Sequence, residues 1–306
     1  MNSSNICIRK HVRNSVAEER QAYLQLHACV VLWGLTAILG RLISLPAVEL
    51  VHWRMALVSI VLLGLRRTWV GLAGTPRHSI VVFVAIGSVV AAHWVAFYTS
   101  IKISNASVAV ACLGFGAIFA AIIEPIVMRR PHERLEILLG ILAVPGVVLI
   151  VGGVPLEMRL GIAAGIVAAL LSAIFTTLNK RFGSNGDPFA ITCLEMSAGA
   201  VLLSVPAFFS GLTMPSQMDA IWLMVLAIVC TLLPFVMWIQ SLKYVSAFST
   251  LLILNLEPVY AIVLAAALFQ EYEDLTPLFY GGTAIVLLTV VLQPQLRRLS
   301  YFKVAR

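Results

Sequence analysis

Long apolar stretches follow one another along nearly the whole chain, and each is about as long as a bilayer requires of a spanning helix, roughly 17 to 25 residues. None of them alternates apolar and polar residues as a membrane β-strand does. The ten stretches are 22–40, 47–65, 79–98, 105–128, 136–153, 160–179, 188–210, 219–240, 246–269 and 276–293. We therefore expect an all-α integral membrane protein with ten transmembrane helices.

The composition agrees with this expectation. Of the 306 residues, 60% are hydrophobic and only 11% are charged, whereas a soluble domain carries about 25% charged residues. A water-soluble fold is thereby excluded. The formal net charge of +7 does not indicate nucleic-acid binding here, because in a membrane protein the distribution of charge among the loops matters more than its sum.

The basic residues are distributed unevenly between the two sides of the membrane. If the N-terminus is cytoplasmic, 17 of the 21 lysines and arginines lie in cytoplasmic segments and three lie on the opposite face. This positive-inside bias predicts that both termini are cytoplasmic, with tails at 1–21 and 294–306. We expect a multi-pass protein of the cytoplasmic (inner) membrane.

One polar phrase occurs twice with the same spacing. The sequence SIKISNAS at 100–107 resembles SLKYVSAF at 241–248, and an offset of 141 residues keeps spans and loops in register from about 46 to 151. The chain therefore divides into two five-helix repeats, 22–153 and 160–293. Because five is odd, the second repeat enters the membrane from the opposite side, which is the inverted repeat of many secondary transporters.

The repeated phrase contains a lysine in each copy, Lys102 and Lys243. A lysine at the end of a span can extend its ammonium group to the membrane interface while its aliphatic part packs on apolar surface. Alternatively, Ser100 and Lys102 could form a nucleophile pair of an integral membrane enzyme or lipid-handling protein. Inversion places the two lysines at opposite faces, which favours the first interpretation.

Three stretches carry a family resemblance: WGLTAILGR at 33–41, HWRMALVSIVLLGL at 52–65 and LNLEPVYAIVLAAALFQE at 254–271. With them the chain resembles the EamA-type permeases of the drug/metabolite transporter superfamily. The resemblance implies ten spans in two inverted repeats and transport of amino acids, other metabolites, sugars or drugs. Several members of that family are exporters. We therefore expect a secondary transporter, not an enzyme, that works by alternating access.

An ionisable group inside a span usually faces a cavity or a partner. Glu257 lies near the middle of the ninth span, and at 100° per residue it shares a polar stripe with Ser246, Thr250 and Tyr260. We expect this stripe to line the pathway and Glu257 to bind substrate or a proton. The alternative is a protonated Glu257 that only bonds a neighbouring helix.

Two further faces carry polar groups. In the third span His93, Phe97 and Ser100 share a face, and a histidine there could bind or relay a proton, or serve only as a structural hydrogen-bond donor. The sixth span presents neutral groups that could bond a polar substrate or merely pack against neighbouring helices; these are Ser172, Thr176 and Asn179.

Arg54 and Glu195 occupy equivalent positions in the two repeats. Inversion separates them by about 10 Å in depth at 1.5 Å per residue, so we expect structural roles and no direct salt bridge. Arg54 would meet Glu49 or a lipid phosphate, and Glu195 would meet Lys180 or Arg181.

The remaining features complete the expectations. Glu124 should be a solvated gate or anchor near Arg130, and Trp94 with Phe97 could shape an outer vestibule. The sequence contains neither a GxxxxGK[ST] phosphate loop nor an HExxH motif, so we expect no cofactor and no metal ligands. The expected partners are a small-molecule substrate, protons as a candidate driving ion, and the lipid bilayer. Two fused repeats can complete a transport unit, so a monomer is expected.

Overall fold

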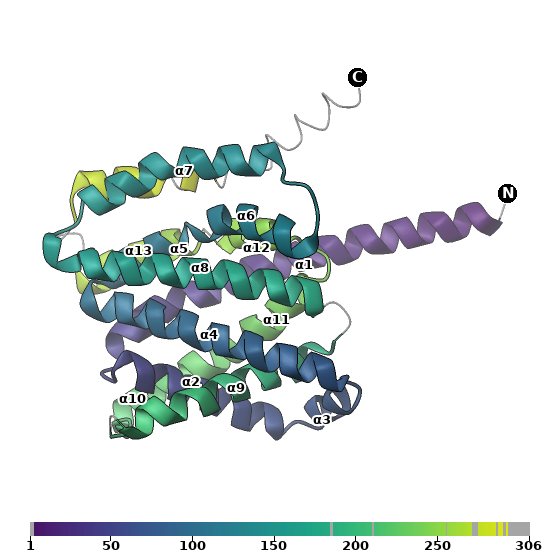
Figure 1. Ribbon diagram of the computed structural model, residues 1–306, viewed down its shortest axis with the longest axis horizontal. Helices are drawn as coiled ribbons and strands as arrows, with labels where there is room; N and C mark the ends of the chain where they lie inside the picture. The colour runs from purple at the N-terminus through teal and green to yellow at the C-terminus, as the bar shows by residue number, and fades with distance from the viewer. Residues whose placement is uncertain are drawn as a thin grey trace.

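The computed structural model describes residues 3–183, 186–209, 211–254, 256–270, 275–285, 287–289 and 292, and over these residues every regular element is helical. The helices pack side by side, and α1 projects beyond the others at one end (Figure 1). In chain order they are α1 (Ser3–Leu42), α2 (Ala47–Leu63), α3 (Arg66–Ala73), α4 (Arg77–Ile103), α5 (Ala106–Leu113), α6 (Gly116–Met128), α7 (Arg134–Gly152), η1 (Leu156–Met158), α8 (Arg159–Phe182), α9 (Pro188–Phe209), α10 (Gln217–Ala227), η2 (Ile228–Leu232), α11 (Leu233–Ser241), α12 (Ala247–Leu254) and α13 (Glu257–Phe269).

Six helical stretches within the described residues are long and apolar enough to cross a membrane, and α2 with α3, bent by 86°, makes a seventh if the pair is one span. The six are Ala17–Leu42, Arg77–Ile103, Ala106–Met128, Leu156–Phe182, Pro188–Pro206 and Gln217–Ser241. The span expected at 276–293 lies partly outside the described residues. Residues 3–21, expected as a tail, are helical and continue the first span as α1.

In the fourth expected span α5 ends at Leu113 and α6 begins at Gly116, and in the ninth α12 ends at Leu254 and α13 begins at Glu257. Every boundary of α12 and α13 is displaced by 141 residues from the matching boundary of α5 and α6. The residues that follow the second helix of each pair, Arg129 and Gln270, both have positive φ, 54° and 56°. The offset found in the sequence is therefore repeated in the backbone, and interrupted helices of this kind build binding sites in transporters.

Local residues explain where α5 and α13 begin. The Asn105 side chain accepts a hydrogen bond from the Val108 N–H at 2.8 Å and so caps α5. In the second repeat Pro258 lies in the first turn of α13. The first turn of a helix does not use its N–H groups within the helix, so the missing N–H of proline costs nothing there. In the interior of a continuous helix the same position would lose a hydrogen bond.

The first turn of α12 is capped by a side chain from the other repeat. The Glu124 carboxylate accepts from the backbone N–H groups of Ala247 at 3.2 Å and Phe248 at 2.8 Å, and Arg130 lies 3.4 Å from it. Glu124 is 2% exposed, so the expectation of a solvated gate residue is wrong. A carboxylate bonded to the N-terminus of a helix is stabilised by its N–H groups and dipole. Glu124 therefore joins α6 to α12.

The two repeated lysines also have defined partners. The Lys102 ammonium donates to the Ile43 carbonyl, and the Lys243 ammonium donates to the Gly186 carbonyl at 3.0 Å. Each bond ties the end of the third helix of a repeat to the loop after the first helix of the same repeat. Ser100 donates to the Gly161 carbonyl at 2.6 Å. Both members of the possible Ser100–Lys102 nucleophile pair thus bond backbone carbonyls.

Helices α4 and α9 approach closely at a glycine. A Cβ atom at Gly87 would lie 2.3 Å from the backbone oxygen of Glu195, so only glycine allows this contact. Small residues at such crossings let helix backbones come together in a membrane. The contact fixes the depth of Glu195 beside α4.

We predict that Glu124→Ala lowers the free energy of unfolding by about 1–2 kcal/mol, because α12 loses its cap. The matched control is Glu133→Ala, since Glu133 also lies 3.4 Å from Arg130 but its side chain is 49% exposed. Thermal unfolding in detergent measures both variants. Equal midpoints for the two variants would contradict the cap.

Candidate functional site

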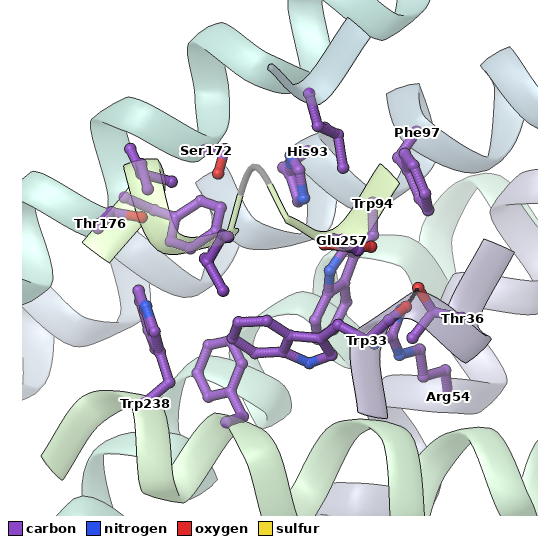
Figure 2. A pocket seen from close by; sticks show the side chains of 15 residues that line it. Trp33, Thr36, Arg54, His93, Trp94, Phe97, Ser172, Thr176, Trp238 and Glu257 are labelled. Carbon is purple, nitrogen blue, oxygen red and sulfur yellow. Dashed lines mark hydrogen bonds between the residues drawn. The ribbon is translucent and has the colours of Figure 1, made fainter. Parts of the chain in front are cut away.

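A cavity lies inside the helix bundle, between elements of both repeats (Figure 2). It contains about 660 Å³ of space outside the atoms, its open mouth included. The lining side chains are Trp33 and Thr36 from α1, Arg54 from α2, His93, Trp94 and Phe97 from α4, Leu113 from α5, Ser172, Phe175 and Thr176 from α8, Phe235 and Trp238 from α11, Leu251 and Leu254 from α12, and Glu257 from α13.

Aromatic rings form much of the cavity wall. Phe235 and Trp238 have ring centroids 5.0 Å apart, Trp94 lies 5.9 Å from Phe235, and Phe175 lies 5.6 Å from Trp238. The pairs are mostly edge to face, the arrangement that aromatic quadrupoles favour. Trp94, which is 6% exposed, is therefore part of the wall of the internal cavity.

Arg54 is the cationic group of the cavity and is 2% exposed. Its Nε donates to the Thr231 hydroxyl at 2.6 Å and its Nη1 to the Tyr98 hydroxyl at 2.9 Å, while the guanidinium lies 3.8 Å from the centre of the Trp94 ring. The expectation that Arg54 reaches a lipid phosphate or takes Glu49 as its main partner is corrected. Its planar guanidinium is held by hydrogen bonds in its plane and by an aromatic face beside it.

An irregular helical turn supplies one of the two hydroxyl groups that Arg54 contacts. Thr231 lies in the π-helical segment η2, and its hydroxyl donates to the Leu226 carbonyl at 2.6 Å, five residues back. Immediately afterwards Pro234 has no N–H to continue the ladder, and its carbonyl accepts from the Cys29 thiol at 3.2 Å. Single π-helical turns occur often at functional sites, and this one turns Thr231 toward Arg54.

Glu257 is the acidic group of the cavity. It is the first residue of α13, directly after the break, and is 6% exposed. Arg54 lines the same cavity, and the two side chains form no ion pair within 4.0 Å among the described contacts. Figure 2 shows both side chains on one side of the cavity in that view, with Ser172, Thr176 and Trp238 on the other. A positive and a negative group, one from each repeat, thus face the same space.

His93 also lines the cavity, as expected from the sequence. Its Nδ1 lies 2.7 Å from the Ala168 carbonyl oxygen, so Nδ1 carries the proton and Nε2 is an acceptor in the neutral ring. Phe97 stacks on His93 with centroids 6.3 Å apart, and Phe175 meets it edge to face at 5.2 Å. The ring is therefore fixed in orientation by α8 while it faces the cavity.

The other candidate residues are placed elsewhere. Ser100 bonds Gly161, Tyr260 is 46% exposed, and Thr250 is buried with no hydrogen-bond partner for its hydroxyl among the described residues. The stripe that joined Thr250 to Glu257 and Tyr260 assumed one continuous helix. Glu257 lines the cavity, whereas Thr250 and Tyr260 are not among the lining side chains.

Asn179 and Glu195 lie outside the cavity lining and close to each other. The Asn179 amide lies beside the Glu195 carboxyl but not in hydrogen-bond geometry. The expected partners of Glu195 bond backbone carbonyls instead: Lys180 donates to Leu242 at 2.5 Å and Arg181 donates to Val127. The prediction of a Glu195 ion pair with either residue is therefore wrong.

Sequence reasoning missed several side chains of the cavity, among them Arg54, Trp33 and Trp238. The signal for Arg54 was present, because a charge inside a span commonly marks a functional site. The argument from depth placed Arg54 near an outer face and left out how far a long arginine side chain reaches. The two tryptophans carry no pattern that separates a cavity wall from ordinary packing.

Apolar helices in two repeats around a cavity lined by both of them are the architecture of a membrane transporter. Residues 20–152 and 159–293 each match the EamA-like transporter family. The chain therefore belongs to the EamA-like transporter family.

Named relatives point in the same direction. Uncharacterized transporter YxxF of Bacillus subtilis (strain 168) is 24% identical over 289 residues, covering 89% of this chain and 91% of that protein. Uncharacterized transporter YyaM of the same organism is 24% identical over 181 residues, covering 56% of this chain and 59% of YyaM, so this match spans less than two thirds of YyaM. An uncharacterized transporter of Archaeoglobus fulgidus is 31% identical over 130 residues, covering 42% of this chain and 46% of that protein.

A solved crystal structure is similar in fold, with a TM-score of 0.67 and 16% sequence identity. The similarity covers 91% of this chain and 98% of the other. It supports the helix arrangement of Figure 1.

We predict that Arg54→Lys lowers the free energy of unfolding by about 1–3 kcal/mol, because the lysine ammonium carries all its donors on one nitrogen and has no plane that stacks on Trp94. The matched control is Arg67→Lys: Arg67 also meets a carboxylate, Asp187 at 3.4 Å, and an aromatic ring, Phe189, but its side chain is 63% exposed. Thermal unfolding should leave the control within about 0.5 kcal/mol of the wild type. Equal losses in both variants would contradict the role of the buried contacts.

Proposed function

We propose that this protein is a secondary transporter that exports small zwitterionic metabolites across the cytoplasmic membrane by alternating access. The observation that carries the proposal is one cavity with Arg54 from the first repeat and Glu257 from the second. Arg54 would bind the carboxylate of the substrate, and Glu257 would bind its ammonium group.

The cavity wall favours an apolar body for this substrate. Six of its lining side chains are phenylalanine or tryptophan, namely Trp33, Trp94, Phe97, Phe175, Phe235 and Trp238. Aromatic rings bind apolar and aromatic groups at low entropic cost, and hydroxyls at Thr36, Ser172 and Thr176 add hydrogen bonds. Amino acids with aromatic or large aliphatic side chains fit this chemistry. A nucleotide sugar would call for more than the single arginine of the cavity.

The proposed transport cycle follows from the duplication. Ten spans with both termini in the cytoplasm would invert the second repeat relative to the first, so that one rocking motion closes one side as it opens the other. The interrupted helices α5–α6 and α12–α13 meet the cavity at Leu113 and at Leu254 with Glu257, so a movement of either repeat changes the cavity directly. A proton gradient is the proposed driving force, and His93 is the second candidate for a proton at the cavity.

We predict that a zwitterionic ligand raises the thermal midpoint of the purified protein, because a ligand that binds only the folded state stabilises it by mass action, by about 2.7 kcal/mol at 100 times Kd. The panel contains amino acids, organic acids, sugars and cationic drugs, each at pH 5.5 and pH 7.5. L-Phenylalanine represents the favoured class.

In Glu257→Gln the apparent affinity for this ligand should fall at least tenfold, because the ammonium group of the ligand loses its counter-charge. The matched control is Glu133→Gln, an exposed carboxyl far from the cavity lining, which should behave as the wild type. Unchanged ligand binding, uptake and export in Glu257→Gln vesicles would contradict the assignment. Stabilisation by lipids alone would favour a lipid-handling protein.

A further inference from the structure

Glu195 is a second buried carboxyl that the cavity does not use. It lies in the N-terminal half of α9 with an exposed fraction of 0%, and within the described part of the chain neither of its carboxyl oxygens has a hydrogen-bond partner. Its backbone is pressed against Gly87 of α4, so the helix cannot turn the side chain toward lipid without losing that close contact. A polar group buried in this way is costly unless another group or a proton satisfies it.

The neighbour of Glu195 connects it to the cavity. The Asn179 amide lies beside the carboxyl, and both of its polar atoms also lack hydrogen-bond partners among the described residues. At 100° per residue Asn179 shares one face of α8 with Ser172 and Thr176, which line the cavity. Asn179 is one turn beyond Thr176, about 4.5 Å along the helix. A polar stripe thus runs from the cavity to Glu195.

The charged and titratable side chains around Glu195 are engaged elsewhere or lie at the exposed helix ends. The elements packed against α9 are α2, α3, α4 and α11; α11 carries no such group. Helix α2 carries Glu49, His52, which contacts the Ala200 carbonyl, and Arg54, which donates to Thr231 and Tyr98. Helix α3 carries the exposed Arg66 and Arg67, which contacts Asp187. Helix α4 carries the exposed Arg77 and His78, and also His93, Tyr98 and Lys102, whose partners are the Ala168 carbonyl, Arg54 and the Ile43 carbonyl in that order.

Beside Glu195 itself, the polar group that acts on its carboxyl is the neutral Asn179 amide. Buried carboxylates without a cation or several donors take up a proton instead of remaining ionised. The environments of Glu257 and Glu195 therefore differ: Glu257 lines the cavity that Arg54 also lines, whereas Glu195 lies outside that lining. Pairs of acids in such different environments commonly take different chemical roles.

We propose that Glu195, together with Asn179, is the proton-binding site of the transporter, separate from the substrate cavity. This inference rests on the proposed function and assigns its driving ion to a particular group. With the cavity closed toward Glu195 the carboxyl holds its proton. When water reaches it, the O–H bond breaks, the proton passes to water, and the Asn179 amide donates to the carboxylate that remains.

The first test measures proton binding without any substrate. In the unfolded chain a glutamate is ionised above about pH 4.3, so a proton held by Glu195 in the folded protein makes stability fall as pH rises. The thermal midpoint of the wild type should fall by about 2 °C per pH unit between pH 5.5 and 7.5 relative to Glu195→Gln. Glu133→Gln, which changes a carboxyl with a 49% exposed side chain outside the cavity lining, is the matched control and should keep the wild-type slope. If Glu195→Gln also keeps it, or if Na⁺ and not protons stabilises the wild type, the proposal is wrong.

A second variant covers the case in which Glu195→Gln does not fold. Asn179→Leu keeps the carboxyl and removes the amide that would stabilise its ionised form. The downward slope should then extend to higher pH than in the wild type. A slope that ends at lower pH in Asn179→Leu would overturn the proposal.

The third measurement uses proteoliposomes with radiolabelled L-phenylalanine as the probe. Glu195→Gln should lose at least tenfold in accumulation driven by a pH gradient and should still exchange labelled for unlabelled probe, whereas Glu257→Gln should lose both. Equal gradient-driven accumulation in the wild type and Glu195→Gln would overturn the proton site. If the wild type does not exchange the probe at all, the proposed substrate class fails, and the stability measurements still decide whether Glu195 binds the proton.

Discussion

The structure depends on how the chain places charged groups inside an apolar bundle. A charge at the centre of a bilayer costs about 2.5–3.5 kcal/mol even on the lower scales, so each such group needs a specific environment. Arg54 receives hydroxyls and an aromatic face, Glu124 receives the N-terminus of α12, and the two lysines receive backbone carbonyls. These bonds also connect elements that are distant in sequence.

The breaks in the helices make the cavity possible. In each repeat a second helix begins three residues after the last residue of the first, and Glu257 is the first residue of α13. The π-helical turn at Thr231 is another local departure from a regular helix, and its Thr231 hydroxyl accepts a hydrogen bond from Arg54.

Much of this architecture can be predicted from the sequence. The apolar spans, the 141-residue offset, and the inward position of Glu257, His93 and Phe97 all follow from length, periodicity and the cost of buried charge. The division of the fourth span at Gly114 and Phe115 could not be predicted, because neither residue is a proline, whereas Pro258 is a sequence signal for the start of α13. The environment of Arg54 depends on a π-helical turn 177 residues away in sequence, and no local pattern records that contact.

The central claim is that one cavity, built by both repeats, opens alternately to the two sides of the membrane. The direct measurement is labelling of Ser172→Cys, in a protein whose five native cysteines are replaced, with a membrane-impermeant maleimide applied to either side of sealed vesicles. The account predicts labelling from both sides, slowed in each case by the bound ligand. Labelling from one side alone, whatever the ligand, would contradict it.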